Sequence, residues 1–224
     1  MKYIIFDAGP LISLAMNGLL PVIAELKKVF KGEFILTPQV KREVIDRPMK
    51  VKKFKLEAMK IKYLLDNGIL KMSHSIVSSH KLEKETKRIM KIVNGTLRVE
   101  KTGEKINIIH EGEASCLAFA KICKGDNVIV LDERSTRLIT ESPEKLKKLM
   151  ESKLKTKIVE EFGLIEELKG FKFIRSAELL FIAYKKNILP ANGDKELLDA
   201  MLYAVKFKGA AISSAEIEEM KRLV

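Results

Sequence analysis

Two aspartates come directly after continuous apolar runs of strand length. Asp7 follows residues 3–6, and Asp132 follows residues 128–131. Runs of this kind, without polar alternation, are typical of strands that are covered on both faces in a parallel sheet. Because the functional crevice of an open parallel sheet lies beyond the carboxyl ends of its strands, we expect both aspartates at that edge.

Two glutamates on predicted helices are expected to join them. Glu113 shares a helix face with Leu117 and Ala120, so its carboxylate faces the sheet and must be paired, neutral or bound to a cation. Glu43 borders the buried face of the predicted helix 39–45. Several carboxylates in one place suit a hard divalent cation such as Mg²⁺, which takes oxygen ligands and offsets their mutual repulsion. The four acids therefore predict a metal-binding cup.

Three of these acids also have a purely structural interpretation. Asp7 and Asp132 precede predicted helices, and aspartate is a common N-cap residue. Glu43 is near enough in the sequence to Lys41 or Arg47 for a surface ion pair. His110 comes just before a predicted helix, where a lone histidine is more often a capping or packing residue than a catalytic one.

Composition favours a folded protein with an anionic partner. The 224 residues include 42 Lys and Arg against 30 Asp and Glu, a net charge of +12. This excess favours nucleic acid as a partner, although the lysine-rich surface of a thermophilic protein would also produce it. The hydrophobic share of 46% argues against disorder, and the length fits one domain with additions.

The sequence predicts a cytoplasmic protein with no membrane partner. The first 24 residues have the outline of a signal peptide, but Asp7, Pro10 and Asn17 interrupt the apolar stretch. No other segment has the length needed to cross a bilayer. Cys116 and Cys123 lie seven residues apart in one predicted helix, roughly 10 Å along its axis, which is too far for a disulfide and fits a reducing compartment.

Strands and helices are expected to alternate along most of the chain. This alternation predicts an α/β fold with three layers, α/β/α, around a mainly parallel central sheet. The predicted strands cover residues 3–7, 34–36, 69–72, 96–99, 106–108, 128–131 and 172–175. The predicted helices cover residues 11–17, 21–30, 39–45, 52–66, 80–93, 111–123, a helix from 134 that Pro143 breaks or restarts, 155–168, 177–187, 197–204 and 214–222.

Residues 48–107 differ in charge from the rest of the chain. Fifteen Lys and Arg stand against six Asp and Glu there, so this basic segment carries nine of the net twelve positive charges. Lys52, Lys53 and Lys55 are candidate contacts to a nucleic-acid backbone, although such charge runs are usually a solvated helix face. The predicted single domain has its core at 1–47 and 108–190, a basic, mostly helical insertion at 48–107 and a C-terminal helical extension at 191–224.

Two other phosphate chemistries are excluded by the residues present. A phosphatase with an aspartyl nucleophile would need a second acid two positions after Asp7, and that position is Gly9. The sequence contains neither a Gly-x-Gly-x-x-Gly turn after its first strand nor a Gly-x-x-x-x-Gly-Lys-Ser/Thr phosphate loop.

The order of these elements and acids resembles the PIN-domain family of metal-dependent nucleases. The ordered combination, rather than any single motif, carries the likeness, and the basic segment is not part of it. It rests on residues 4–12 with Asp7, 36–40 leading to Glu43, 112–114 with Glu113, 130–134 with Asp132 leading to Arg137, and 179–189, which resemble the last strand-following helix of prokaryotic PIN proteins.

The resemblance implies both a site and a reaction. The family's acidic set falls on Asp7, Glu43, Glu113 and Asp132, which would be the catalytic residues and the ligands of one or two Mg²⁺ or Mn²⁺ ions. The implied reaction is hydrolysis of RNA phosphodiester bonds to 5′-phosphate products.

The resemblance also concerns the residues around this set. Arg134 and Arg137, with the lysines of the basic segment, would hold the RNA backbone, although ordinary surface charge is the simpler interpretation of any one of them. Family members often carry Asp where this chain has Glu113, and Ser or Thr soon after the first Asp, where this chain has Ala8 and Gly9.

Three functional classes stay open. The first is a Mg²⁺- or Mn²⁺-dependent endoribonuclease, either an RNA-processing enzyme or a toxin whose antitoxin protein covers the acids. The second is a catalytically weak or inactive RNA-binding module that uses the basic segment. The third is an interaction protein that assembles through its C-terminal helices, for example as a homodimer. The presence of all four acids favours the first.

Overall fold

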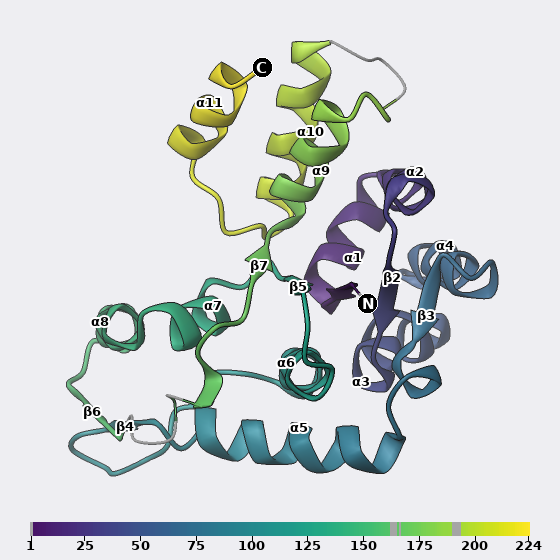
Figure 1. The fold of residues 1–224 in the computed structure, drawn as a ribbon. Helices are drawn as coiled ribbons and strands as arrows, with labels where there is room; N and C mark the ends of the chain where they lie inside the picture. Colours follow the sequence, from purple (N-terminus) through teal and green to yellow (C-terminus); the bar gives the residue numbers. More distant parts are fainter. Residues whose placement is uncertain (1, 162–164, 166, 190–193) are drawn as a thin grey trace.

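A fully parallel, five-stranded sheet forms the centre of the molecule, with strand order β3-β2-β1-β5-β7. The computed structural model describes residues 2–161, 165, 167–189 and 194–224. Helices cover both faces of the sheet, which confirms the predicted three-layer α/β/α class (Figure 1). The strands are β1 (Tyr3–Phe6), β2 (Glu33–Leu36), β3 (Leu70–Met72), β5 (Asn127–Val130) and β7 (Phe173–Ile174).

The two helical layers have different make-up. On one side, α6 (Glu111–Ile122) packs against β1 and β5, and α5 (Ser79–Val93) runs along its outer side (Figure 1). On the other side lie α1 (Ala8–Met16) and α2 (Pro21–Val29), both of which contact α9 (Ser176–Lys185). The apolar runs of β1, β2 and β5 are almost entirely buried between these layers, as their lack of polar alternation predicts.

The remaining helices extend this core at its rims. After β2, α3 (Pro38–Lys41) packs against α6, and α4 (Lys55–Asp66) packs against α1 and β3. At the C-terminal end, α10 (Lys195–Phe207) packs between α9 and α11 (Ser214–Arg222), so these three helices form one unit (Figure 1). The other elements are η1 (Arg42–Asp46), η2 (Pro48–Lys50), η3 (Ser73–Ser75), α7 (Arg134–Glu141) and α8 (Pro143–Leu154).

The basic segment contributes one strand to the central sheet. Its strand β3 pairs in parallel with β2, with Phe34 opposite Leu70, and is therefore the edge strand of the sheet. The strand predicted at residues 69–72 is thus confirmed, and its parallel pairing with β2 joins residues 48–107 to the core.

The structure corrects the predicted helix 155–168 and the predicted strand 106–108, which is near enough to the predicted strand 96–99 for the two to form a hairpin. Residues Ile158–Glu160 form the strand β6, which pairs antiparallel with β4 (Leu97–Val99). Residues 162–164 and 166 of that predicted helix lie outside the described residues. The hairpin is only partly regular: Ile106 N–H donates to the Leu97 carbonyl at 2.9 Å, but residues 106–108 do not form a strand. Pairing across sixty residues decided both outcomes, and local patterns do not report it.

Two further expectations, on membrane-spanning segments and on the two cysteines, can be compared with the structure. Within the described ranges, no single helix is long and apolar enough to cross a membrane; α1 and α2 reach that composition only as a pair, and the chain bends by 119° between them. Cys116 is buried, Cys123 is half-buried, and both are free thiols, as their spacing predicts.

Candidate active site

The chain reverses its direction of travel across the sheet between the neighbouring strands β1 and β5. We call the carboxyl edge of this strand pair the gap. From β1 the strands proceed outward through β2 to β3, and after the return to β5 they proceed the opposite way to β7. Such a topological switch point is the usual ligand-binding crevice of an open α/β sheet. Asp7 directly follows β1, and Asp132 lies two residues beyond the end of β5. Both predicted aspartates therefore lie at the carboxyl edge on either side of this gap.

Asp7 is held at the gap by its own backbone and by the first turn of α1. Its N–H donates to the Val130 carbonyl at 3.1 Å, so the pairing of β1 with β5 extends to this residue. Its carboxylate accepts the Gly9 N–H at 3.3 Å as the N-cap of α1, as the structural interpretation predicts. Burial, and then the negative charge of Glu113, raise the pKa of Asp7 to about 7 despite these amide contacts. The cap role and the buried charge thus coexist in one side chain.

Asp132 is anchored from the opposite side of the gap. Its carboxylate accepts the Ser176 N–H at 2.8 Å and the Ser176 hydroxyl at 2.9 and 3.0 Å. It does not cap α7, because Glu133 occupies that position and accepts the Ser135 N–H. Burial raises the pKa of Asp132, while Ser176 and the charges of Arg137 and Arg175 act against the rise.

Glu43 reaches the gap through an irregular turn. Helix α3 continues into the π turn η1, where Arg47 N–H donates to the Arg42 carbonyl at 3.0 Å, a wider turn of a type frequent at functional sites. The Glu43 carboxylate then lies against the first turn of α6 and accepts the Gly112 N–H. A Cβ atom on Gly112 would come within 2.9 and 3.0 Å of the two Glu43 oxygens, so only glycine leaves room for this approach. Burial raises the pKa of Glu43, and Arg47 and the Gly112 N–H oppose that change.

Glu113 lies one residue further along the same helix. One of its carboxylate oxygens accepts the His110 N–H at 2.9 Å, and the other accepts the hydroxyl of Thr136. His110 is the N-cap residue of α6, so the first of these bonds is half of a capping box, and His110 has the structural role that was predicted. Burial raises the pKa of Glu113, and both hydrogen bonds oppose the rise.

Electrostatic coupling shows that the acids are gathered rather than scattered. The charges of Glu113 and Glu43 both raise the pKa of Asp7. The buried thiol of Cys116 is affected first by burial and then by Asp7, Glu113 and Glu43 in turn, which together hold its pKa well above the usual value. Asp132 joins from the far side of the gap, because a Cβ on Gly9 would lie 3.7 Å from an Asp7 oxygen and 4.0 Å from the Asp132 Cβ.

The four carboxylates have the donor chemistry that a divalent cation needs, but their oxygens do not converge on one point. They are oxygen donors whose pKa values burial raises, so a bound cation would stabilise their ionised forms. Within the described ranges, however, no three His, Cys, Asp or Glu side chains are spaced to hold one ion. Glu113 and Asp132 are turned onto Thr136 and Ser176 instead. Metal binding here requires these two side chains to rotate away from their present donors.

The predicted cationic residues lie in two different places. Lys52, Lys53 and Lys55 are exposed where the chain enters α4, with the Lys53 ammonium 5.3 Å from the Phe54 ring centre. Arg134 and Arg137 lie on α7, directly after Asp132, and the positive charge of Arg137 acts on that carboxylate. Only the arginines are therefore placed beside the acids by the structure.

Sequence patterns did not identify Gly112, Thr136 or Ser176 as parts of the site. Ser176 is the first residue of α9, and nothing in the neighbouring sequence indicates that it binds Asp132, which follows a different strand. Gly112 could have been suspected, because glycine is unfavourable inside a helix by roughly 1 kcal/mol and usually needs a reason.

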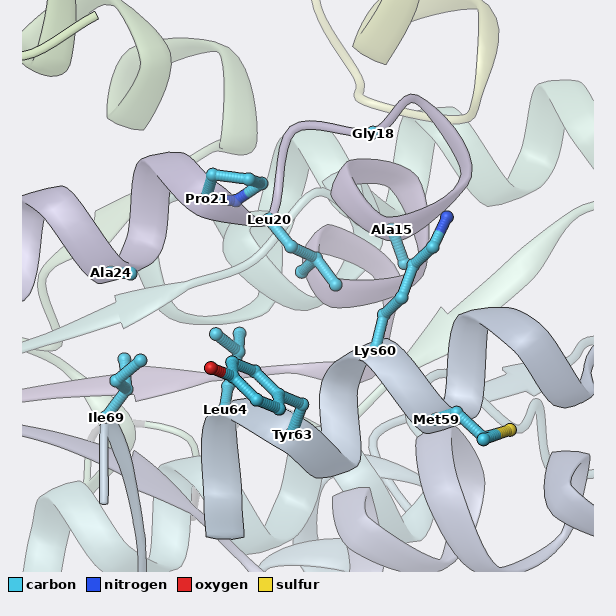
Figure 2. A pocket seen from close by; sticks show the side chains of 10 residues that line it. All are labelled: Ala15, Gly18, Leu20, Pro21, Ala24, Met59, Lys60, Tyr63, Leu64 and Ile69. Carbon is cyan, nitrogen blue, oxygen red and sulfur yellow. The ribbon is translucent and has the colours of Figure 1, made fainter. Parts of the chain in front are cut away.

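A large apolar pocket elsewhere differs from the acid centre, the cluster formed by Asp7, Glu43, Glu113 and Asp132. It has a volume of about 560 Å³ and lies between the α1–α2 turn and α4, with Leu20, Tyr63 and Leu64 around it (Figure 2). Lys60 is the one charged residue among those that line it, and none of the four acids does. No set of polar groups converges there, so the acid centre remains the candidate active site.

No family model, curated protein or solved structure matches this chain. The features that indicate a function are therefore the geometry and electrostatics of the site.

Proposed function

We propose that the chain is a PIN-like, divalent-metal-dependent ribonuclease that hydrolyses phosphodiester bonds of RNA at the gap between β1 and β5. The observation that carries the proposal is Asp7, a carboxylate buried at a topological switch point with the charges of Glu113 and Glu43 next to it. A fold does not keep this arrangement for stability, because each buried like charge disfavours the ionised form of the others.

The side chains divide into ligands and supports. Asp7, Glu43, Glu113 and Asp132 would hold Mg²⁺ or Mn²⁺, and such an ion supplies a more acidic water and stabilises negative charge on the phosphate. Thr136 and Ser176 hold the carboxylates of Glu113 and Asp132 in the structure, and metal binding would exchange these contacts for the ion. The net charge of +12 supports an anionic substrate, and with acids of this kind RNA is the substrate class we infer.

The test is cleavage of a short 5′-labelled single-stranded RNA in Mg²⁺, Mn²⁺ or EDTA, by the parent chain and by Asp7→Asn. We expect metal-dependent cleavage that Asp7→Asn lowers by about 100-fold or more, because a ligand charge is lost while the volume and the N-cap are kept. Asp66→Asn is the matched control, since Asp66 is exposed at the end of α4 and should be neutral. Equal cleavage by parent and Asp7→Asn would refute the proposal and indicate a contaminating nuclease.

A second candidate is an RNA-binding module without catalysis. It is favoured by one specific observation, the engagement of Glu113 and Asp132 with protein donors rather than with a shared point. Mn²⁺ binding followed by electron paramagnetic resonance separates the two candidates. The ribonuclease requires bound Mn²⁺ that is lost in Asp7→Asn, whereas RNA binding without bound Mn²⁺ supports the inactive module.

A further inference from the structure

A basic pocket lies on the Asp132 side of the acid centre. It has a volume of about 680 Å³ and is enclosed by α7, the start of α9, the end of α10 and the loop before α11. Four cationic side chains and one carboxylate line it, and Ala210–Ser213 complete its wall. The charged residues are Arg134, Arg137, Arg175, Lys206 and Glu216.

One of these cations is structural and already compensated. Arg175 is buried and donates to the carboxylates of Glu178 and Glu216, at 2.7 Å in the second case, and to the Ala211 carbonyl at 2.9 Å. Burial alone would raise the pKa of Glu216, but the Ser213 N–H and Arg175 outweigh burial and hold it at about 2. Glu216 is therefore committed to Arg175 and leaves the other cations of the pocket without a carboxylate.

The other three cations have no carboxylate partner within 4.0 Å among the described residues. Arg137 is half-buried, and its Nε atom is fully buried without a hydrogen-bond acceptor. Burial, and then the positive charge of Arg175, lower the pKa of Arg137, and the more distant carboxylates of Glu141, Glu178 and Glu216 act against this change. Lys206 donates to the hydroxyl of Ser214 and lies 5.2 Å from the Tyr203 ring centre. The residues that line the pocket thus carry an excess of positive charge, which suits an anionic ligand.

The pocket and the acid centre share a wall. Ala211 lines the pocket, and its N–H donates to the Asp132 carbonyl at 3.3 Å. Arg175 precedes Ser176, whose N–H and hydroxyl hold the Asp132 carboxylate. The basic pocket therefore directly adjoins the Asp132 side of the acid centre.

We propose that the pocket binds a phosphate group of the nucleic-acid substrate, adjacent to the phosphate that is cleaved at the acid centre. The proposal rests on the proposed function and adds the element that sets how the strand lies across the site. Guanidinium groups match the geometry of phosphate oxygens, and an ammonium adds a point charge. The phosphate belongs either to the backbone inside the strand or to a 5′ end, and the binding experiment distinguishes these sources.

The experiment measures binding without cleavage. Two 3′-labelled single-stranded RNAs of the same sequence, one with a 5′ hydroxyl and one with a 5′ phosphate, are titrated in EDTA and followed by fluorescence anisotropy over a range of salt concentrations. The pocket variant is Arg137→Gln with Lys206→Gln, which leaves the structural Arg175 in place. The matched control is Lys145→Gln with Lys208→Gln, which removes two exposed lysines that do not line the pocket.

We expect the pocket variant to bind at least about tenfold more weakly than the control, and its salt slope to fall by about 0.7, the value for one lost phosphate contact on a single strand. A loss shared by both RNAs assigns the pocket to a backbone phosphate, and a loss confined to the 5′-phosphorylated RNA assigns it to the strand end. A pocket variant that binds both RNAs like the control overturns the proposal, once circular dichroism shows equal folding.

Inorganic phosphate gives a second readout that needs no RNA and no metal. It should raise the melting temperature of the parent and of the control variant, and not that of the pocket variant. Because neither measurement involves cleavage, an inactive chain that binds phosphate here would refute the ribonuclease but not the pocket. An active chain whose pocket variant behaves like the control would do the reverse.

Discussion

The acid centre and the basic pocket meet at Asp132, and they differ in whether their buried charges are paired with opposite charges. In the acid centre, carboxylates are buried together, and the amide and hydroxyl contacts that they receive do not bring the pKa of Asp7 below about 7. In the basic pocket, the most buried cation, Arg175, is paired with two carboxylates, and only the outer cations lack a partner. The first region buries its uncompensated charge, and the second keeps its unpaired cations half-buried or exposed.

This difference indicates which region carries the larger energetic cost. A half-buried or exposed cation keeps part of its solvation and costs less, whereas a buried carboxylate beside other carboxylates destabilises the fold until it binds a proton or a cation. The acid centre should therefore respond strongly to pH and to divalent ions. The basic pocket should respond mainly to salt and to phosphate.

The largest expected effect is on the pH dependence of stability. The pKa of Asp7 rises from 3.8 to about 7 on folding, so between these values the folded chain keeps a proton that the unfolded chain has released. Stability should therefore fall as pH rises from about 4 to 7, by about 4 kcal/mol from this group. Denaturant unfolding in EDTA should show a larger fall in the parent than in Asp7→Asn, which keeps only the contributions of the other acids.

Divalent ions sharpen the same prediction. At pH 8, Mg²⁺ or Mn²⁺ should restore part of the lost stability of the parent, because a cation replaces the missing proton, and should do less for Asp7→Asn. Parallel stability curves for parent and variant at every pH would mean that the acid centre is compensated like the basic pocket, and the contrast between the two regions would be wrong.

A smaller effect is expected from a single methyl group. In Gly112→Ala the new Cβ meets the Glu43 carboxylate, which is the flexible end of a side chain and can move away. We expect Mn²⁺ affinity and cleavage to fall by about tenfold, while the free energy of unfolding stays equal or rises by up to ~1 kcal/mol, since alanine is the better helix former.

Gly9→Ala is the matched control for that variant. Its Cβ would also lie beside two of the acids, but at ordinary contact distances, 3.7 Å from an Asp7 oxygen and 4.0 Å from the Asp132 Cβ. Cleavage should stay at the level of the parent. An equal loss in both glycine variants would mean that any added bulk disturbs the acid centre, and that Glu43 has no special place in it.

The smallest effect is expected at the exposed lysines before α4. Replacing Lys52, Lys53 and Lys55 together by Ala should lower the salt slope of RNA binding by at most about 2, or 0.7 for each contact, and leave Mn²⁺ affinity unchanged. The loss of affinity should be smaller than in the pocket variant, because these side chains are exposed and do not lie in a pocket that positions them.

The control for this triple variant removes the same charge from another surface. Lys81, Lys84 and Lys91 are exposed on α5, on the outer side of α6. If both triple variants lower RNA affinity equally, the lysines before α4 act only through net charge. If the triple variant before α4 exceeds the pocket variant, the main anionic contact lies there, and the basic pocket is secondary.

The parts of this molecule that sequence patterns predicted are those fixed by short-range chemistry. The apolar runs before Asp7 and Asp132 specified two buried parallel strands, and the carboxyl-edge rule then placed both aspartates correctly. The cap at Thr37 and the proline after it located the start of α3. The helix at 214–222 matches α11 residue for residue, where Ser213 and Glu216 form a capping box.

What escaped prediction depends on contacts between distant segments. The apolar pair at 158–159 fits a helix or a strand equally well, and only its pairing with β4 decides between them. Arg175 and Lys206 belong to one pocket because α9 and α10 pack side by side, and neither residue stands in a basic run. The π turn at 42–46 that aims Glu43 likewise has no local signature.

Glu113 carries a consequence for how this position tolerates substitution. Its side chain reaches back to the His110 N–H, and the extra methylene of glutamate suits that reach, which accounts for a glutamate where the resemblance would place an aspartate. The same carboxylate contributes charge to the acid centre. Substitutions of Glu113 should therefore impair the start of α6 as well as the chemistry of the acid centre. Glu43 also contacts the start of this helix, because its carboxylate accepts the Gly112 N–H.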